Sequence, residues 1–406
     1  MNEKGYQTVL VETRENFTTL LENARSLVPN LKARVQEVDE IRKLPEATIN
    51  EMTELGLFNI LTPERYGGNQ LTFREYIDVV RELGKGCGST AWVAALYNVA
   101  KWFVAAIFTD EVHQEVFKDN GASNICGVFE PRKCKVKKVP GGYLIEEGLW
   151  GFCSGSQHSD YFFLGFPLID ENGEGNELGV ALIPKENVKI LDDWHTISMR
   201  GTGSNSVTVS NVFVPENWTA SISKGIVGEF PDSLVRGEAS YNSGFVPVAA
   251  LVLTAPGLGL VSAALDYFVE RLPKRRIQYT WYNNQADAPV THLQLAEAVM
   301  KSETAHLHVY RAANEIDRWA KEGKYMDFEA RAKVRADCSY ATRLTMEAIE
   351  ILMSAGGGSA IAENNPLSRI MKDGKTPPQH GLLTPTTGLE LYGRVLSERE
   401  PNTVLI

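Results

Sequence analysis

Apolar residues recur with two different periods along this chain, and the points where the period changes divide it into three parts. Up to about residue 120 they stand three and four apart, the spacing of amphipathic helices. From about 124 to 235 they alternate with polar residues between Gly- and Pro-containing turns, as in antiparallel strands. After about residue 240 the helical spacing returns. The 406 residues therefore predict helices, then a β module, then a helical bundle, with domains at 1–123, 124–235 and 236–406.

The composition is that of a soluble, folded protein, with 43% hydrophobic and 23% charged residues. Lys and Arg number 41 against 51 Asp and Glu, and the net charge of −10 argues against a general nucleic-acid or anionic-membrane surface. The first residues lack the basic and apolar regions of a signal peptide, so a cytoplasmic location is expected. The five cysteines show no zinc-type spacing, and no metal site is predicted.

The stretch from Pro247 to Leu265 carries no charge and approaches the roughly 20 residues that span a bilayer. Pro256 interrupts it, and no cluster of Lys or Arg flanks it as a topology signal. A buried bundle helix, kinked near Pro256, is therefore favoured over a membrane span.

Four segments in a fixed order carry a resemblance to a known family. They are GSTAW at 88–92, GGYLIEEGLWGFCSGSQHSDY at 141–161, WHTISMRGTGSNSVTVSNVFVPE at 194–216, and PLSRIMKDGKTPPQHGLLTPTTGLELYGRVL at 366–396. With the helix–β–helix order, they resemble the acyl-CoA dehydrogenase fold. Within it they are most similar to the oxygenase components of two-component flavin monooxygenases, such as 4-hydroxyphenylacetate hydroxylases, dibenzothiophene monooxygenases and amino-sugar nitrososynthases. The resemblance implies an α+β fold with an N-terminal helical domain, a central antiparallel β barrel or sandwich, and a C-terminal four-helix bundle, assembled as a homotetramer.

The same resemblance implies a reaction. A separate reductase supplies reduced flavin, either FMN or FAD, and O2 adds at C4a to form a hydroperoxide. This intermediate passes one oxygen to the carbon, nitrogen or sulfur of a small aromatic or amine substrate. The sequence contains neither GxGxxG nor GxxxxGK[ST], which disfavours a Rossmann or P-loop enzyme and fits a partner reductase.

Two other interpretations stay open. An acyl-CoA dehydrogenase-like FAD oxidoreductase is the alternative enzyme, although the segment from Gln379 to Leu382 lacks the glutamate base that dehydrogenases of this fold often carry there. A non-catalytic scaffold with this fold is the third interpretation, and it predicts no flavin binding.

Two catalytic residues follow from the resemblance. Ser154, in the run Trp150 to Gly155, matches the hydroxyl residue that lies beside flavin N5 and C4a. His380 matches a histidine that reaches the flavin and substrate face, where a group with pKa near neutrality can move a proton. The structural alternatives are that Ser154 only closes a strand turn and that His380 is a surface or capping residue of a Pro-rich loop.

The expected cofactor-binding residues lie in several segments. Arg276 and Tyr279 fit the R-x-x-F/Y element that meets flavin phosphate, since guanidinium suits phosphate. The alternative is that this basic run is a solvated charged face. The remaining cofactor candidates are Trp150, Ser154, Ser204 in the RGTGS loop, Gly356 and Gly357 in a glycine run that the resemblance places at a subunit interface, and Arg369.

Substrate contacts are predicted on the helix that follows GSTAW. Asn98, Lys101 and Trp102 stand three and four apart, hence on one helical face. Lys101 either contacts an anionic or carbonyl-bearing substrate or extends outward to solvent. Ala100 stands where many aromatic hydroxylases of this group have a histidine, which puts a simple phenol substrate in doubt. The segment 223–244 has little periodicity and is predicted to form a substrate lid.

Overall fold

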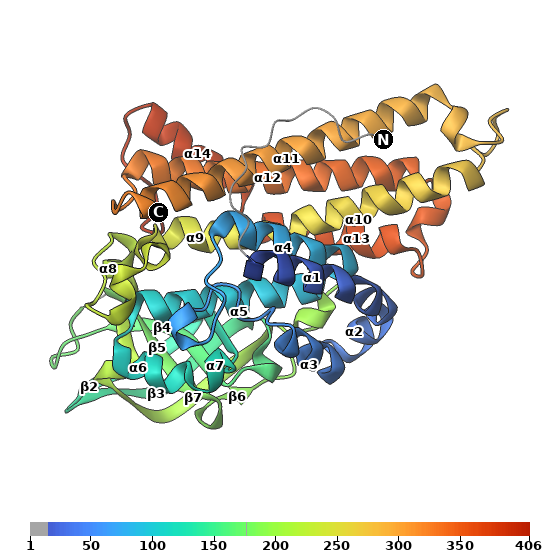
Figure 1. Ribbon diagram of the computed structural model, residues 1–406. Helices are drawn as coiled ribbons and strands as arrows, with labels where there is room; N and C mark the ends of the chain where they lie inside the picture. Colours follow the sequence, from blue (N-terminus) through green and yellow to red (C-terminus); the bar gives the residue numbers. More distant parts are fainter. Residues whose placement is uncertain (1–14, 176) are drawn as a thin grey trace.

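The N-terminal helices lie between the β module and the C-terminal bundle (Figure 1). The computed structural model describes residues 15–175 and 177–406. Its first helices are α1 (Glu15–Ala33), α2 (Val35–Ile41), α3 (Glu46–Glu54), α4 (Phe73–Gly86), α5 (Gly88–Ile107), α6 (Asp110–Val116) and α7 (Lys118–Gly121). A reciprocal capping box between Thr72 and Glu75 begins α4, and the carboxylate of Asp317 accepts from the Phe73 and Arg74 amides at 3.1 and 3.2 Å.

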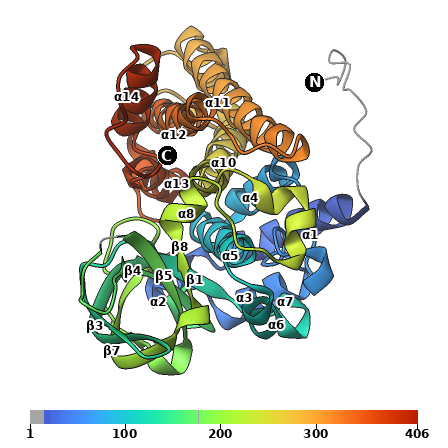
Figure 2. The ribbon, with the colours of Figure 1, turned by 90° about the vertical axis from the view of Figure 1, so that its left-hand side faces the viewer.

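The β module consists of two four-stranded sheets that face each other at the lower left of Figure 2. The strands are β1 (Ile125–Val128), β2 (Lys133–Val139), β3 (Gly142–Cys153), β4 (Tyr161–Leu168), β5 (Glu177–Pro184), β6 (Lys189–Ile190), β7 (Asn205–Pro215) and β8 (Thr219–Ser221). The sheet orders are β1-β4-β5-β8 and β2-β3-β7-β6. All pairs are antiparallel except β1 with β4, which run parallel. The predicted antiparallel module is thus a sandwich with one parallel pair.

The C-terminal part is the predicted helical bundle. Its helices are α9 (Phe245–Val252), α10 (Ala255–Arg271), α11 (Pro289–Lys321), α12 (Phe328–Ala355), α13 (Pro366–Gly374) and α14 (Pro385–Leu396). The short helix α8 (Ile222–Ile226) follows β8 and contacts β5. The kink expected near Pro256 is a break between α9 and α10. Pro256 stands in the first turn of α10, where a missing backbone N–H breaks no hydrogen bond.

Two helical stretches are long and apolar enough to cross a bilayer, Gly88–Ile107 and Phe245–Lys274. Inside the protein, 94% and 89% of their most apolar windows are buried. Such burial is typical of core helices, as predicted for 247–265.

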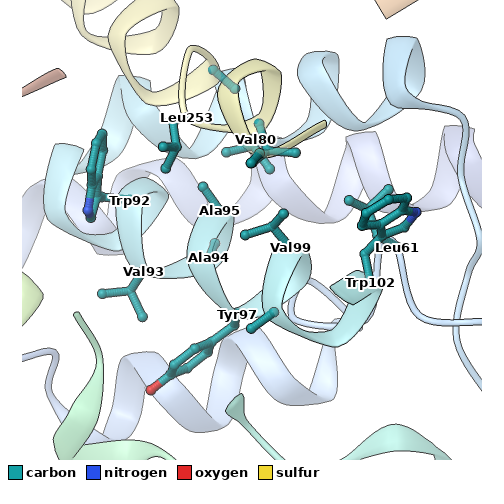
Figure 3. Close-up of a cluster of buried hydrophobic side chains, with 14 of the residues drawn as sticks. Leu61, Val80, Trp92, Val93, Ala94, Ala95, Tyr97, Val99, Trp102 and Leu253 are labelled. Atoms are coloured by element: carbon teal, nitrogen blue, oxygen red, sulfur yellow. The ribbon is translucent and has the colours of Figure 1, made fainter. Parts of the chain in front are cut away.

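Helix α5 is the centre of the core, and every residue in it except Leu96 is buried. Figure 3 shows how its two sides differ: Val80 and Leu253 pack on one side, whereas Tyr97 points the other way. The helix therefore supports both the bundle side and the β side of the molecule.

The N-terminal helices and the bundle meet at a close crossing of α4 and α10. A Cβ built at Gly84 would lie 2.9 Å from Gly259 Cα, and one built at Gly259 would lie 2.3 Å from the Arg81 carbonyl oxygen. Only glycine allows backbones to approach so closely. The two helical parts are consequently in backbone contact.

Candidate functional site

A chain of three hydroxyls lies where β3 ends and the loop 200–204 meets it. The Oγ atoms of Ser154 and Ser204 are 2.7 Å apart, and Ser204 Oγ is 2.6 Å from Thr202 Oγ1. Thr202 donates its own proton to the Met199 carbonyl at 2.8 Å. Ser204 must therefore donate to Thr202, and Ser154 must donate to Ser204, because each hydroxyl has one proton. The Ser154 oxygen keeps acceptor capacity and has no further proton to give.

Large apolar side chains are exposed beside these hydroxyls. Phe152 is 64% exposed and Ile197 is 79% exposed, and the Trp194 ring lies edge-on to Phe152 at 6.1 Å. Phe152 has a φ of +65°, which costs a bulky residue about 1–3 kcal/mol. The Arg132 guanidinium lies 5.3 Å from the Phe152 ring, and exposed apolar groups of this kind are typical of binding surfaces.

The first turns of α5 hold two separate segments of the site. Tyr97 donates from its hydroxyl to the Gly155 carbonyl at 2.6 Å, directly after Ser154. Gly155 has a φ of +77°, and a Cβ there would lie 2.6 Å from the Tyr97 ring, so glycine is required. Trp92, on the same helix, meets the His380 ring edge-on at 5.8 Å. Residues far apart in the sequence, Ser154 and His380, are thus both anchored on α5.

His380 lies in the loop before α14 and is partly buried. The Leu382 amide donates to its Nδ1 at 3.2 Å, so the neutral ring carries its proton on Nε2. Burial, and secondly the charge of Arg335, lower the pKa of His380 to about 4. The imidazole is therefore neutral at physiological pH and offers an Nε2–H donor.

Trp150 is placed away from this surface. Its ring is fully buried in the β module, and its Nε1 donates to the Gly165 carbonyl at 2.7 Å. Residues two apart on a regular strand face the same side, but the register shifts between Trp150 and Cys153, so Phe152 does not follow Trp150 inward. The exposed aromatic ring beside Ser154 belongs to Phe152, which the sequence did not single out.

The three predicted substrate residues of α5 form internal contacts. Asn98 bonds to the backbone of Leu57, Ile60 and Leu61, and Trp102 donates to the Ser240 carbonyl at 3.1 Å. Lys101 donates to Asn59 Oδ1 at 2.6 Å and to the Gly121 carbonyl at 2.8 Å. Burial lowers the pKa of Lys101 to about 7. The structure does not bring these residues to Ser154, and their predicted substrate role has no contact here to support it.

The predicted lid is hydrogen-bonded to the C-terminal end of α5. Arg236 donates to the carbonyls of Ala105 and Ala106, and Tyr241 donates to the Leu61 carbonyl at 2.9 Å. These bonds hold residues 236–241 near the C-terminal end of the helix. The lid role stays a prediction.

The glycine run meets an arginine, but it is Arg275 and not Arg276. A Cβ at Gly357 would lie 2.7 Å from Arg275 Nη2, and Arg275 and Gly356 line the same small hollow. Arg276 instead donates to Gln278 at 3.0 Å, and Tyr279 is fully exposed. Which of two adjacent arginines in a basic run lies beside the glycine run cannot be decided from sequence alone.

Arg369 connects helices rather than opening onto the hydroxyl chain. It pairs with Asp39 at 2.9 Å and approaches Asp373 at 3.8 Å. Asp373 in turn accepts from the Met199 amide at 2.7 Å. Arg369 therefore supports the loop 199–204 indirectly, and its contact with cofactor stays a prediction.

Comparisons with known proteins identify the family. Residues 15–119 match the acyl-CoA dehydrogenase N-terminal domain, and residues 251–385 match the acyl-CoA dehydrogenase C-terminal domain. The flavin-dependent monooxygenase oxygenase subunit HsaA of Rhodococcus jostii is 30% identical over 91% of this chain and 95% of its own. The chain belongs to the flavin-dependent monooxygenases of the acyl-CoA dehydrogenase fold.

Further relatives agree with this family. A pigment production hydroxylase of a Rhodococcus species is 30% identical over 93% of this chain and 96% of its own. The structure of XiaF from Streptomyces sp., in complex with FADH2 and glycerol, matches with a TM-score of 0.89 at 28% identity, covering 96% of this chain and 97% of that one. Flavin-dependent monooxygenases are enzymes, so the expected oxidoreductase activity is confirmed and the scaffold interpretation is set aside. The same relatives favour the monooxygenase over the dehydrogenase alternative.

Proposed function

We propose that this protein is the oxygenase component of a two-component system, which binds reduced flavin between Ser154 and His380 and oxygenates a small aromatic or amine substrate. The hydroxyl chain from Ser154 to Thr202 is the observation that carries the proposal. Because Ser154 gives its one proton to Ser204, its Oγ can only accept from a bound group. An acceptor suits the N5–H group that a flavin ring has in its reduced form.

The residues around Ser154 fit a flavin ring. Phe152, Trp194 and Ile197 offer an apolar surface for a flat aromatic system, and the buried hydroxyls offer one polar contact at its edge. Reduced flavin, when bound, supplies the activation of O2. The protein holds the ring, excludes water with its apolar rim, and presents His380.

His380 is the group that we propose to face the substrate. Its neutral ring donates from Nε2 and holds a proton close to the oxygen that is transferred. The substrate would then lie near Trp92, which packs against His380. The identity of the oxygenated atom, carbon, nitrogen or sulfur, is decided by the substrate that this space admits.

The phosphate end of the cofactor is proposed to meet Arg275, Gly356 and Gly357. In one chain Arg275 and Gly356 line a hollow that shares no lining residue with the hollow beside Gly155. A second copy would therefore supply the phosphate contacts, which is consistent with a homotetramer. An exposed apolar stripe on α11, formed by Leu293, Met300 and Leu307, provides a surface for such assembly. A flavin reductase is the proposed transient partner, and a cytoplasmic location is proposed as well.

The test uses the full-length protein with a generic flavin reductase, NADH and O2, and screens phenols, indoles, sulfides and amines by mass spectrometry. We expect an oxygenated product whose added oxygen comes from ¹⁸O2. Acyl-CoA compounds, mixed with the protein and oxidised FAD without O2, are the comparison. Direct bleaching of FAD by an acyl-CoA, without any ¹⁸O-labelled product, would overturn the proposal.

A further inference from the structure

Arg335 is a buried cation behind His380. It stands on α12, is 4% exposed, and forms no ion pair with any carboxylate of residues 15–175 and 177–406. Its guanidinium donates instead to three backbone carbonyls. Nε meets Leu382 at 2.9 Å, Nη2 meets Gly381 at 2.8 Å, and Nη1 meets Leu405. Burying a charge without an acid is costly, so this arrangement calls for an explanation.

The peptide bond between Gly381 and Leu382 joins Arg335 to His380. Its carbonyl oxygen accepts from Arg335, and its N–H donates to His380 Nδ1 at 3.2 Å. A cation on the carbonyl pulls electron density through the amide and strengthens the N–H as a donor. A strong donor at Nδ1 keeps the ring proton on Nε2. The chain of contacts therefore runs from the guanidinium through one amide to the imidazole.

The charge of Arg335 acts in the same direction as this bond. Positive charge nearby disfavours imidazolium, so Arg335 adds to the effect of burial on the pKa of His380. Trp92, which faces the ring from α5, carries no charge. Near Arg335 on α12, burial raises the pKa of the Cys338 thiol, which stays neutral. A carboxylate behind a histidine has the opposite effect, since it places the proton on the nitrogen that faces it and raises basicity.

We propose that Arg335 is a positioning residue that holds His380 as a neutral imidazole with its proton on Nε2. The importance of His380 for the reaction rests on the proposed function, whereas the link between Arg335 and the ring does not. The role of Arg335 is electrostatic and geometric, and it touches neither substrate nor cofactor.

The test compares Arg335→Met with Arg331→Met. Arg331 stands one turn earlier on α12 and also donates to two backbone carbonyls, of Ile226 and Ile406, at 2.8 and 2.9 Å. It has no contact with 381–382, so it is a matched control for lost packing and lost charge. The readout is the ring ¹⁵N signal of His380 in histidine-labelled protein, assigned with His380→Gln, followed from pH 4 to 8 without flavin or substrate.

We expect Arg335→Met to move the His380 titration upward, by about one pH unit, and to populate the Nδ1–H tautomer. Arg331→Met should lower the melting temperature and leave both properties of the ring unchanged. If Arg335→Met leaves the tautomer and titration as in the wild type, or if Arg331→Met changes them equally, the proposal is overturned.

Two further measurements keep the test decisive. If Arg335→Met does not fold, Arg335→Lys keeps the charge but cannot reach both carbonyls, and it should raise the Nδ1–H fraction. In the wild type itself, a His380 ring protonated on Nδ1 at pH 7 would contradict the proposal directly. Product formation is then measured on the same variants. A changed tautomer with wild-type turnover would refute the proposed function of His380 and leave the role of Arg335 standing.

Discussion

Ser154 owes its chemistry to neighbours that fix the direction of one proton. It donates to Ser204, which donates to Thr202, so its oxygen remains an acceptor. The site motif around Ser154 could be predicted from sequence, because the residues are adjacent. The polarity of the hydroxyl chain could not, since Thr202 and Ser204 come from a loop about 50 residues away.

Ser154→Ala should leave the fold intact and increase the share of reduced flavin that ends as hydrogen peroxide. One lost hydrogen bond of about 1 kcal/mol corresponds to about a fivefold change in this partition. The measurement is the ratio of product to hydrogen peroxide per NADH consumed. Ser156→Ala is the control, because Ser156 is a neighbouring buried serine that bonds to the Gly203 carbonyl instead. Unchanged coupling in Ser154→Ala would remove Ser154 from the site.

His380→Ala should lower product formation by about 100-fold while reduced flavin still binds. Because burial and Arg335 lower the pKa of His380 to about 4, the group gains a proton only as pH falls toward 4. The wild-type pH profile of product formation should therefore show no acid limb near pH 6.5 that depends on His380. Such a limb would mean that the imidazole titrates in its ordinary range.

Arg275→Ala should weaken reduced-flavin binding by about 10-fold or more, since a hydrogen bond to a charged group contributes about 1.5–3 kcal/mol. Arg276→Ala should change binding little, because Arg276 bonds to Gln278 away from the glycine run. Equilibrium titration of anaerobic reduced flavin measures both. The opposite order of effects would restore Arg276 as the phosphate ligand.

At the scale of elements, the predictions that depended on local pattern agree with the structure. The helical and strand periods on either side of residue 124, and the interruption of the apolar stretch at Pro256, were readable from nearby residues. The parallel pairing of β1 with β4 was not, because it joins strands separated by the β2–β3 hairpin. The different directions of Trp150 and Phe152 have a related cause: a register shift near the end of β3 changes which side chains face outward.

Helix α4 begins on a carboxylate from α11, and this contact has a pH dependence. Burial raises the pKa of Asp317 to about 6, above its ordinary value near 3.8. Between these values the folded state holds the extra proton, so this group's contribution to stability falls as pH rises from about 4 to 6. Asp317→Asn should not show that loss. Its free energy of unfolding should therefore rise relative to that of the wild type between pH 4.5 and 7.

Urea unfolding at the two pH values checks this expectation for Asp317→Asn. Glu303→Gln, which changes an exposed carboxylate on the same helix, is the control and should track the wild type. A constant difference between Asp317→Asn and wild type at both pH values would show that Asp317 titrates normally.

At the scale of the whole molecule, the order of helices, β module and helices was predictable because each part has its own period. The relation between Arg275 and Ser154 was not, because they belong to distant segments and the hollow that Arg275 lines does not include Ser154. How copies associate depends on exposed groups such as Leu293, Met300, Leu307 and Trp281, which have no local partner to constrain them.

Leu307→Glu should dissociate the proposed homotetramer and weaken reduced-flavin binding in parallel, since the proposed phosphate contacts come from a second copy. Leu307 is 71% exposed in one chain, so the substitution should cost the isolated fold little. Analytical ultracentrifugation and flavin titration on the same samples measure both effects. Val227→Glu, at another exposed apolar residue, should retain the assembly. A wild-type sedimentation coefficient for Leu307→Glu would exclude α11 from the interface.

The glycine crossing of α4 and α10 has a consequence for how small molecules enter. Two helices whose backbones touch at Gly84 and Gly259 cannot slide or tilt apart without losing that contact along both. The helical parts on either side of α5 should therefore move as one piece, and a hinge between them is not available. Motion between α4 and α10 therefore does not admit substrate and flavin, and their entry is expected to depend on the loops and the β module instead.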